Sequence, residues 1–217
     1  AVNVDAGEAS ETVRRFLPLA ERLGRLASAL VGGMGERLEV CVEGPLSSED
    51  CRLLTLAALK GVVGPFVHEP VSFVNAPHMA AERGLEVRET KSPTSREYVN
   101  LVTVRGGRAG RSISVAGTLA GKAESPRIVL IDDHTVDVPP AAHMLVVRNR
   151  DTPGVIGLVG TILGEAGINI ADMGVGRGPG DERALMVLAT DSPVGPEILE
   201  RLRAQPGIGD AQAIELG

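Results

Sequence analysis

The chain has 217 residues, of which 43% are hydrophobic, and this is enough apolar material for one large or two modest globular domains. The formal net charge is −6 and no cluster of Lys and Arg interrupts it, so the attraction that drives non-specific nucleic-acid binding is missing. Aromatic residues make up only 2% of the chain, which argues against base-stacking surfaces, and we expect no nucleic-acid partner.

Other classes of site are also disfavoured. The sequence has no apolar run of about 18 residues and no signal sequence, which predicts a cytoplasmic protein without a membrane span. Cys41 and Cys51 are expected to be buried thiols, and the four histidines lack the spacing of metal ligands, so no metal site is predicted. The chain opens with AVNVDAG and no initiator methionine, and we expect it to be part of a longer polypeptide.

The first half of the chain predicts helices followed by strands. Ser10 is expected to cap a long amphipathic helix that ends near Val31, before a glycine-rich segment. A strand follows at 38–44, then a nearly all-apolar, buried helix that starts within 47–50, and a third helix at about 71–83. Further strands are expected at 85–90, 98–105, 112–119, 127–132 and 134–138, with GGRAG (106–110) as a hairpin turn. Pro139-Pro140 is the best candidate for a linker.

The second half predicts the order strand, helix, strand, strand, helix, strand. A strand at 144–149 leads into the turn 151–154, where Thr152 is expected to cap a helix whose first residue is Pro153. The N–H groups that follow would then be free to receive a carboxylate. Gly167 is expected to end this helix, and the later elements are a strand at 168–175, a strand at 182–190, a helix at 196–207 and a strand at 210–216.

Two glycine patterns in this half need an interpretation. Gly157, Gly160 and Gly164 lie along one side of the first helix, which indicates either the close approach of a backbone or ligand or close packing of the helix on its own sheet. The run 174–180 lies between two strands, so it predicts a hairpin loop and not a dinucleotide-binding loop. We find no other fingerprint of a nucleotide site.

The second half resembles an ACT domain, a small ligand-binding module of amino-acid metabolism. The resemblance rests on Asp151-Thr152-Pro153-Gly154 and on Gly167-Ile168-Asn169-Ile170. The preceding part, with VNVDAG, VSFVNAP (71–77) and the pattern from Ser114 to Gly121, is similar to the intervening regulatory domain of long-form D-3-phosphoglycerate dehydrogenase. Together they imply an α+β chain: a mixed α/β intervening domain at 1–139, then a ferredoxin-like βαββαβ ACT domain at 140–217.

The resemblance also implies a function and its residues. The chain would be the regulatory and oligomerisation part of the dehydrogenase, with L-serine as effector, at least a dimer, and with NAD bound only by a catalytic part outside this chain. The effector-binding residues would be Asn149, Asp151, Gly154 and Val155 of one chain and Asn169 of its partner. Asn149 stands where the family often carries an aromatic residue or His. A second anion site would use Arg127 and His134.

Two other functions remain open at this point. The first is a subunit of an iron–sulfur L-serine dehydratase, which has a similar domain pair. Such a subunit would need cysteines that bind the cluster, and the two cysteines of this chain, ten residues apart, do not meet that requirement. The second is an oligomerisation module without a ligand. Asp151 and Asn169 also have a purely structural interpretation, as a turn residue and as a residue that follows a helix end.

Overall fold

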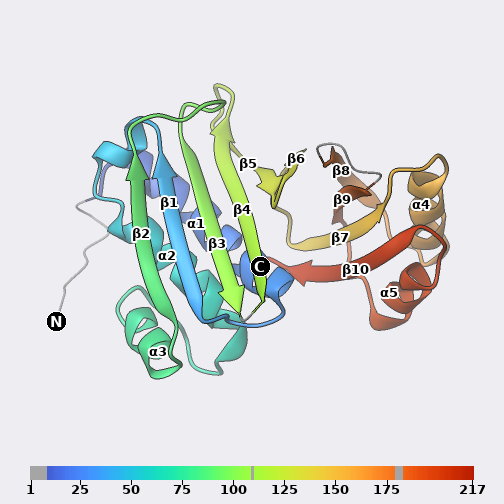
Figure 1. Ribbon diagram of the computed structural model, residues 1–217, viewed down its shortest axis with the longest axis horizontal. Helices are drawn as coiled ribbons and strands as arrows, with labels where there is room; N and C mark the ends of the chain where they lie inside the picture. Colours follow the sequence, from blue (N-terminus) through green and yellow to red (C-terminus); the bar gives the residue numbers. More distant parts are fainter. Residues whose placement is uncertain (1–8, 109, 179–182) are drawn as a thin grey trace. The chain divides into compact units, whose positions relative to one another are not determined.

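The computed structural model describes residues 9–108, 110–178 and 183–217, and the chain divides into two compact units, Ala1–Ile128 and Val129–Gly217. The first unit contains a sheet with helices on one face (Figure 1). Its helices are α1 (Glu11–Val31), α2 (Arg52–Val63) and α3 (Ala76–Glu82). Its strands are β1 (Arg37–Glu43), β2 (Glu86–Ser92), β3 (Leu101–Arg108), β4 (Arg111–Ala120) and the first part of β5 (Ser125–Ile131), which continues into the second unit. No helix among the described residues is long and apolar enough to cross a membrane.

The strands of this sheet follow the order β2-β1-β3-β4-β5-β6, in which β6 is His134–Val138. β1 and β2 are parallel, whereas β1–β3 and β3–β4 are antiparallel pairs. The expected hairpin is present, but Gly106 and Gly107 lie within β3 and pair with β4, so GGRAG is not all turn. Gly107 also accepts a hydrogen bond from the N–H of Glu36 at 2.7 Å, which explains why the strand continues through the glycines. Ala109 of this segment lies outside the described residues.

The first helix begins and ends as the sequence predicts. Ser10 Oγ accepts a hydrogen bond from the N–H of Val13 at 3.2 Å, which is the expected N-cap. Gly32 ends the helix with a φ of 80°, and its N–H donates to the carbonyl oxygens of Ser28 and Ala29. The helix buries its apolar side against β3, β4 and α2.

α1 and α2 cross at two glycines. A Cβ atom at Gly24 would collide with the carbonyl oxygen of Ala58, and one at Gly61 would collide with the carbonyl oxygen of Glu21. Lys60 Nζ donates to Glu21 Oε2 at 2.9 Å beside this crossing. Since backbone meets backbone at both positions, only glycine fits there, and the core of the first unit is built on this close contact.

Two helix starts in the first unit were predicted wrongly, because side chains and turns compete for the backbone. Residues 45–48 form a 3₁₀ turn and α2 begins only at Arg52, whose N–H donates to Asp50 Oδ1 at 3.2 Å. α3 begins at Ala76, not near residue 71, since the N–H of Ser72 donates to Asn75 Oδ1 at 2.7 Å and closes a local turn. The burial of α2 on nearly all sides is confirmed.

The second unit contains the ferredoxin-like order that the sequence predicts. Its elements are β7 (His143–Arg150), α4 (Val155–Glu165), β8 (Ile170–Arg177), β9 (Arg183–Thr190), α5 (Pro196–Arg203) and β10 (Ile208–Glu215). The sheet order is β10-β7-β9-β8, and α4 and α5 pack on one face of it (Figure 1). Leu145, Val147, Met186 and Leu188 supply the core on this helix side.

The start of α4 differs from the prediction and its end agrees with it. The helix begins at Val155 after Gly154, which adopts a φ of 93°, so Thr152 is not the cap and Pro153 is not the first helical residue. A glycine with positive φ turns the chain sharply at this point, which delays the helix. At the other end Gly167 has a φ of 72° and the N–H of Ile168 donates to the carbonyl oxygen of Leu163, as in a Schellman motif.

β6 packs on the face of the ACT sheet opposite to the helices. Cβ atoms at Gly174 and Gly176 of β8 would meet Val138 and Thr135, so glycine lets β6 approach closely. β6 therefore belongs to the second unit, whose border lies between Ile128 and Val129, whereas the sequence places the linker at Pro139-Pro140. The glycine run predicted as a loop at 174–180 begins within β8, and Pro179 and Gly180 lie outside the described residues.

Candidate functional site

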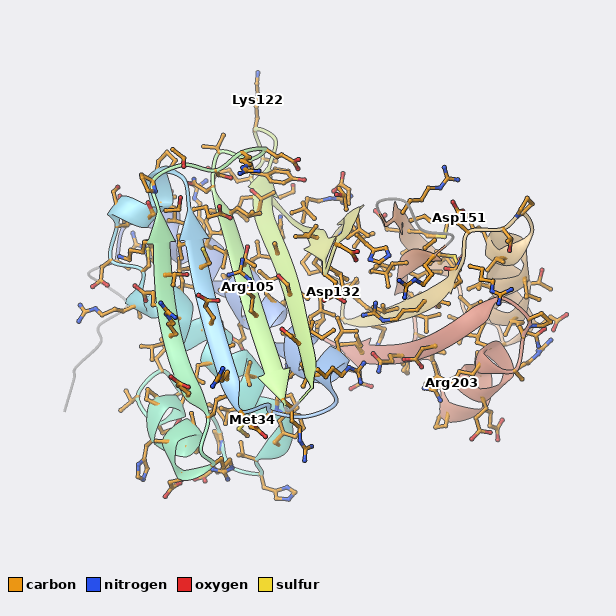
Figure 2. The ribbon with its side chains drawn as sticks, in the orientation of Figure 1. Met34, Arg105, Lys122, Asp132, Asp151 and Arg203 are labelled. Carbon is orange, nitrogen blue, oxygen red and sulfur yellow. The ribbon has the colours of Figure 1, made fainter. Side chains whose placement is uncertain are left out.

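The turn between β7 and α4 places a carboxylate beside a guanidinium. Asp151 lies directly after β7 and before α4 (Figure 2). Its Oδ2 lies 2.7 Å from Nε of Arg177, the last residue of β8, and the Arg177 side chain is 75% exposed. Asp151 of the turn and Arg177 of β8 therefore place a negative and a positive group side by side. Such a pair complements the ammonium and carboxylate groups of a free amino acid.

The start of α4 offers backbone donors next to this pair. The first N–H groups of a helix have no carbonyl partner inside it. The N–H of Val155 makes only a long hydrogen bond of 3.5 Å to the carbonyl oxygen of Thr152, and Gly154 is exposed. A carboxylate at this position would meet the positive end of the helix; Gly154 is exposed there, whereas Val155 is buried at 6% exposure.

Asn149 lies in the wall beneath the turn and not on its surface. Its side chain is only 7% exposed, and Nδ2 donates to the carbonyl oxygen of Arg150 at 2.7 Å. Oδ1 is buried and has no hydrogen-bond partner among the described residues. A buried amide oxygen without a donor is costly, so a ligand that reached it after a small side-chain rotation would remove that cost.

Asn169 lies at the opposite end of the sheet from Asp151. The pairing of β7, β8 and β9 places Ile170 and His143 beside Thr190, whereas Asn149 pairs with Ala184. At about 3.3 Å per residue, the two ends are roughly 20 Å apart along the strands. Asn169 is exposed, and its backbone N–H donates to Asp191 Oδ1 at 3.0 Å. One chain therefore does not bring Asp151 and Asn169 to a common ligand.

The glycines of α4 face away from the chain. Cβ atoms built at Gly157, Gly160 and Gly164 would have no atom within 4 Å. The alternative that these glycines serve the packing of the helix on its own sheet is therefore wrong. Ile156, beside them on the same helix, is 49% exposed.

The two residues of the predicted second anion site lie on different strands and in different units. Arg127 is part of β5 within the first unit, and His134 is the first residue of β6 in the second. His134 is 9% exposed, and its Nδ1 lies 2.8 Å from Asp133 Oδ1 without the geometry of a hydrogen bond. This site stays a prediction.

Sequence reasoning missed Arg177 and a group of arginines near Asn149. Arg177 reaches Asp151 through the register of β8, β9 and β7, which no local pattern predicts. Arg148 and Arg150 are adjacent to Asn149 in the sequence, and Arg150 pairs directly with Arg183 of β9. The alternation Arg-Asn-Arg was the available signal, since residues two apart in a strand share a face.

The described residues contain no group of three His, Cys, Asp or Glu side chains that could hold a metal ion. Cys51 is buried and its Sγ donates to the carbonyl oxygen of Leu46 at 3.3 Å, while Cys41 is half-buried on β1. Burial raises the pKa of the Cys51 thiol above its ordinary value. The predicted burial is therefore confirmed for Cys51, whereas Cys41 is only half-buried.

Comparison with known proteins agrees with this architecture. Residues 12–132 match the model of the D-3-phosphoglycerate dehydrogenase intervening domain, which is more than half of the chain, and residues 143–207 match the ACT domain. The chain belongs to the D-3-phosphoglycerate dehydrogenase intervening-domain family. Its intervening and ACT domains are the regulatory domains that the sequence predicts, and the predicted α+β fold is confirmed.

Relatives named D-3-phosphoglycerate dehydrogenase align along the whole chain. The protein of Archaeoglobus fulgidus is 38% identical over 221 residues, that of Synechocystis sp. is 36% identical over 219, and that of Bacillus subtilis is 31% identical over 218. In each case the alignment covers 100% of this chain but only 41%, 39% and 41% of the relative. The chain thus spans about two fifths of the length of these proteins.

Proposed function

We propose that this chain is the effector-binding and assembly part of a D-3-phosphoglycerate dehydrogenase and that its effector is L-serine, bound between two ACT domains. The dehydrogenase activity, its NAD cofactor and its place in serine biosynthesis would belong to the whole cytoplasmic enzyme. The glycine run at 174–177 lies in β8 and leads to another strand, so it is not a glycine loop of the kind that binds NAD before a helix.

The observation that carries this proposal is the charge arrangement at the turn after β7. Asp151 would bind the ammonium group of serine, and the N–H groups near Gly154 and Val155 would bind its carboxylate. Asn149 would bind the hydroxyl group after its side chain rotates out of the wall. Each of these contacts pairs one part of the amino acid with a group of complementary charge or hydrogen-bonding type.

The position of Asn169 makes the proposed site depend on a second copy of the chain. Asn169 and Asp151 lie at opposite ends of one sheet, and a two-fold axis places opposite ends of two sheets side by side. Asn169 of the partner chain would then cover the ligand. The unpaired edge strand β8, which exposes Met173 (38%) and Val175 (37%), offers an apolar edge for such pairing.

Isothermal titration with L-serine tests the proposal. We expect saturable heat for the wild-type chain, and roughly tenfold to hundredfold weaker binding for Asp151→Ala and for Asn169→Ala, because hydrogen bonds to a charged ligand are worth about 1.5–3 kcal/mol. Glu200→Ala removes a carboxylate from the exposed side of α5 and should bind serine normally. Circular dichroism verifies that every variant is folded.

Two results would favour another function. If millimolar serine gives neither heat nor a change in melting temperature, the chain is an oligomerisation module. Unchanged serine affinity in both alanine variants would place the ligand elsewhere, and Arg127 and His134 would be the next residues to substitute. A dehydratase subunit is disfavoured since the sequence has only two cysteines, and neither lies in a metal-binding group.

A further inference from the structure

β6 packs tightly on the face of the ACT sheet that lies opposite to α4 and α5. Within the second unit it contacts β8 and β9, and its side chains Val136 and Val138 are 3% and 0% exposed. The strand before it, β5, crosses the border between the two units, which lies between Ile128 and Val129. β6 therefore joins the ACT sheet to a strand that begins in the first unit.

Two glycines of β8 permit this packing. A Cβ atom at Gly176 would lie 2.6 Å from the carbonyl oxygen of Thr135 and 3.0 Å from Cβ of His134. A Cβ atom at Gly174 would lie 2.8 Å from Cγ1 of Val138. Since a side chain at either position would force the two strands apart, the position of β8 at these residues depends on β6.

The same strand carries Arg177, directly after Gly176. Arg177 pairs with Ala184 of β9, and Ala184 pairs with Asn149 of β7, so these three residues form one row across three strands. Nε of Arg177 lies 2.7 Å from Oδ2 of Asp151, which follows β7. A displacement of β8 at Gly176 would therefore move the guanidinium that accompanies Asp151.

β6 and the turn after β7 are reached from opposite faces of the sheet. Successive residues of a strand point to opposite faces, so Gly176 meets β6 and Arg177 lies on the side of the helices. An amino acid bound beside Asp151 would not need to touch β6. An effect of one on the other would instead pass through β8.

We propose that β6 couples the serine site to the first unit: its packing on Gly174 and Gly176 holds Arg177 beside Asp151, and serine bound there stabilises this packing in return. Such a coupling is reciprocal by thermodynamic necessity. The ligand in this inference rests on the proposed function, whereas the link from β6 to the pair of Asp151 and Arg177 exists without a ligand. Through β5, the link would connect serine binding with the intervening domain.

The link is tested first without a ligand. Gly176→Ala should separate β6 from β8, and Gly33→Ala is the control, since a Cβ atom at Gly33 would meet no atom within 4 Å. In Gly176→Ala we expect amide hydrogen exchange at 134–138 to be at least about tenfold faster. The carboxyl carbon resonance of Asp151 should move toward its position in Arg177→Gln. If the exchange rate or this resonance is the same as in Gly33→Ala, the proposal is overturned.

Titration with L-serine then tests the reciprocal effect. We expect Gly176→Ala to bind serine about three- to tenfold more weakly than Gly33→Ala, because it acts through the solvent-exposed Arg177. Added to Arg177→Gln, it should cause no further loss, since both changes act on one ion pair. Serine should also slow exchange at 134–138 in the wild-type chain. Unchanged serine affinity in Gly176→Ala would overturn the coupling. If no chain binds serine, the proposed function is wrong, and the Asp151 resonance alone decides the link.

A second variant shows whether alanine acts through β6 or on β8 itself. At Gly174 the atom nearest to an added Cβ is Cγ1 of Val138, so Gly174→Ala should repeat the effects if Gly176→Ala does not fold. The double variant Gly174→Ala with Val138→Ala removes that collision and should recover slow exchange and serine affinity, compared with Val138→Ala alone. If the double variant recovers neither, alanine disturbs β8 directly and the proposal is wrong.

Discussion

Asp151 has a cationic neighbour before any ligand arrives, and this changes what a substitution at the turn would do. Nε of Arg177 lies 2.7 Å from Oδ2 of Asp151. A carboxylate has two acceptor oxygens and a guanidinium has several N–H donors, so both groups have the capacity for further contacts with a bound amino acid. In the proposed serine site, Arg177 would orient Asp151 and complement the carboxylate of the ligand.

We therefore predict that Arg177→Gln weakens serine binding about three- to tenfold. This is less than the loss expected for Asp151→Ala, since the Arg177 side chain is mostly exposed and its interactions are screened by solvent. Isothermal titration at two salt concentrations measures the loss, which should shrink as salt rises. Arg201→Gln is the matched control on α5. Tighter serine binding in Arg177→Gln would show that Arg177 competes with the ligand for Asp151.

The two cysteines should differ in reactivity. Burial raises the pKa of the Cys51 thiol, so less of it is thiolate at pH 8, and access to its sulfur is also restricted. Cys41 is half-buried and should react first with a thiol reagent such as Ellman's reagent. Because the pKa is raised in the folded state, the neutral thiol stabilises the fold below the unfolded pKa, and this contribution is lost as pH rises through the folded pKa. Fast labelling of Cys51 in the Cys41→Ser variant would contradict this.

Some features of the candidate site could be predicted from the sequence and others could not. The positions of Asp151 and Asn169, at the ends of their elements, follow from turn signals and strand alternation. The ion pair of Asp151 with Arg177 and the opposition of Arg150 and Arg183 depend on strand register, which the sequence does not fix locally. The burial of Asn149 Oδ1 could not be predicted from the sequence either, because it depends on residues that are distant in the chain.

At the scale of elements, helix ends were predictable where a glycine or a cap acts alone. Ser10 begins its helix through a side-chain cap, and Gly32 and Gly167 end theirs with a positive φ, as the local sequence already specifies. The starts of α2, α3 and α4 were misplaced because a 3₁₀ turn, the turn from Ser72 to Asn75, and Gly154 occupy the preceding backbone. In each case a competing local hydrogen bond or a positive φ outweighed helix propensity.

The two sets of helical glycines should respond in opposite ways to alanine. Gly157 and Gly164 of α4 have open space where a Cβ would stand, so alanine should stabilise the separate chain by about 0.8–1 kcal/mol at each position through helix propensity. Gly24 and Gly61 are the matched controls in α1 and α2, where alanine collides with a backbone carbonyl and should strongly destabilise. Urea unfolding measures both effects.

The same α4 variants also report on assembly. If the outward glycines permit close contact with a second copy, Gly157→Ala should weaken self-association in sedimentation velocity while the folded chain gains stability. If Gly157→Ala instead destabilises the separate chain, other residues of the same chain occupy the space next to Gly157.

At the scale of the whole molecule, the proposed serine site needs two chains, and this gives the sharpest test. In a two-fold dimer each site would combine Asp151 of one chain with Asn169 of the other. A heterodimer of Asp151→Ala with Asn169→Ala then contains one site with both substitutions and one with neither. Random exchange yields heterodimers as about half of all dimers, so mixing should restore high-affinity binding in about a quarter of the sites. Titration before and after subunit exchange measures this fraction, and native mass spectrometry counts the heterodimers. If heterodimers form and no high-affinity sites return, Asp151 and Asn169 do not share a ligand across two chains.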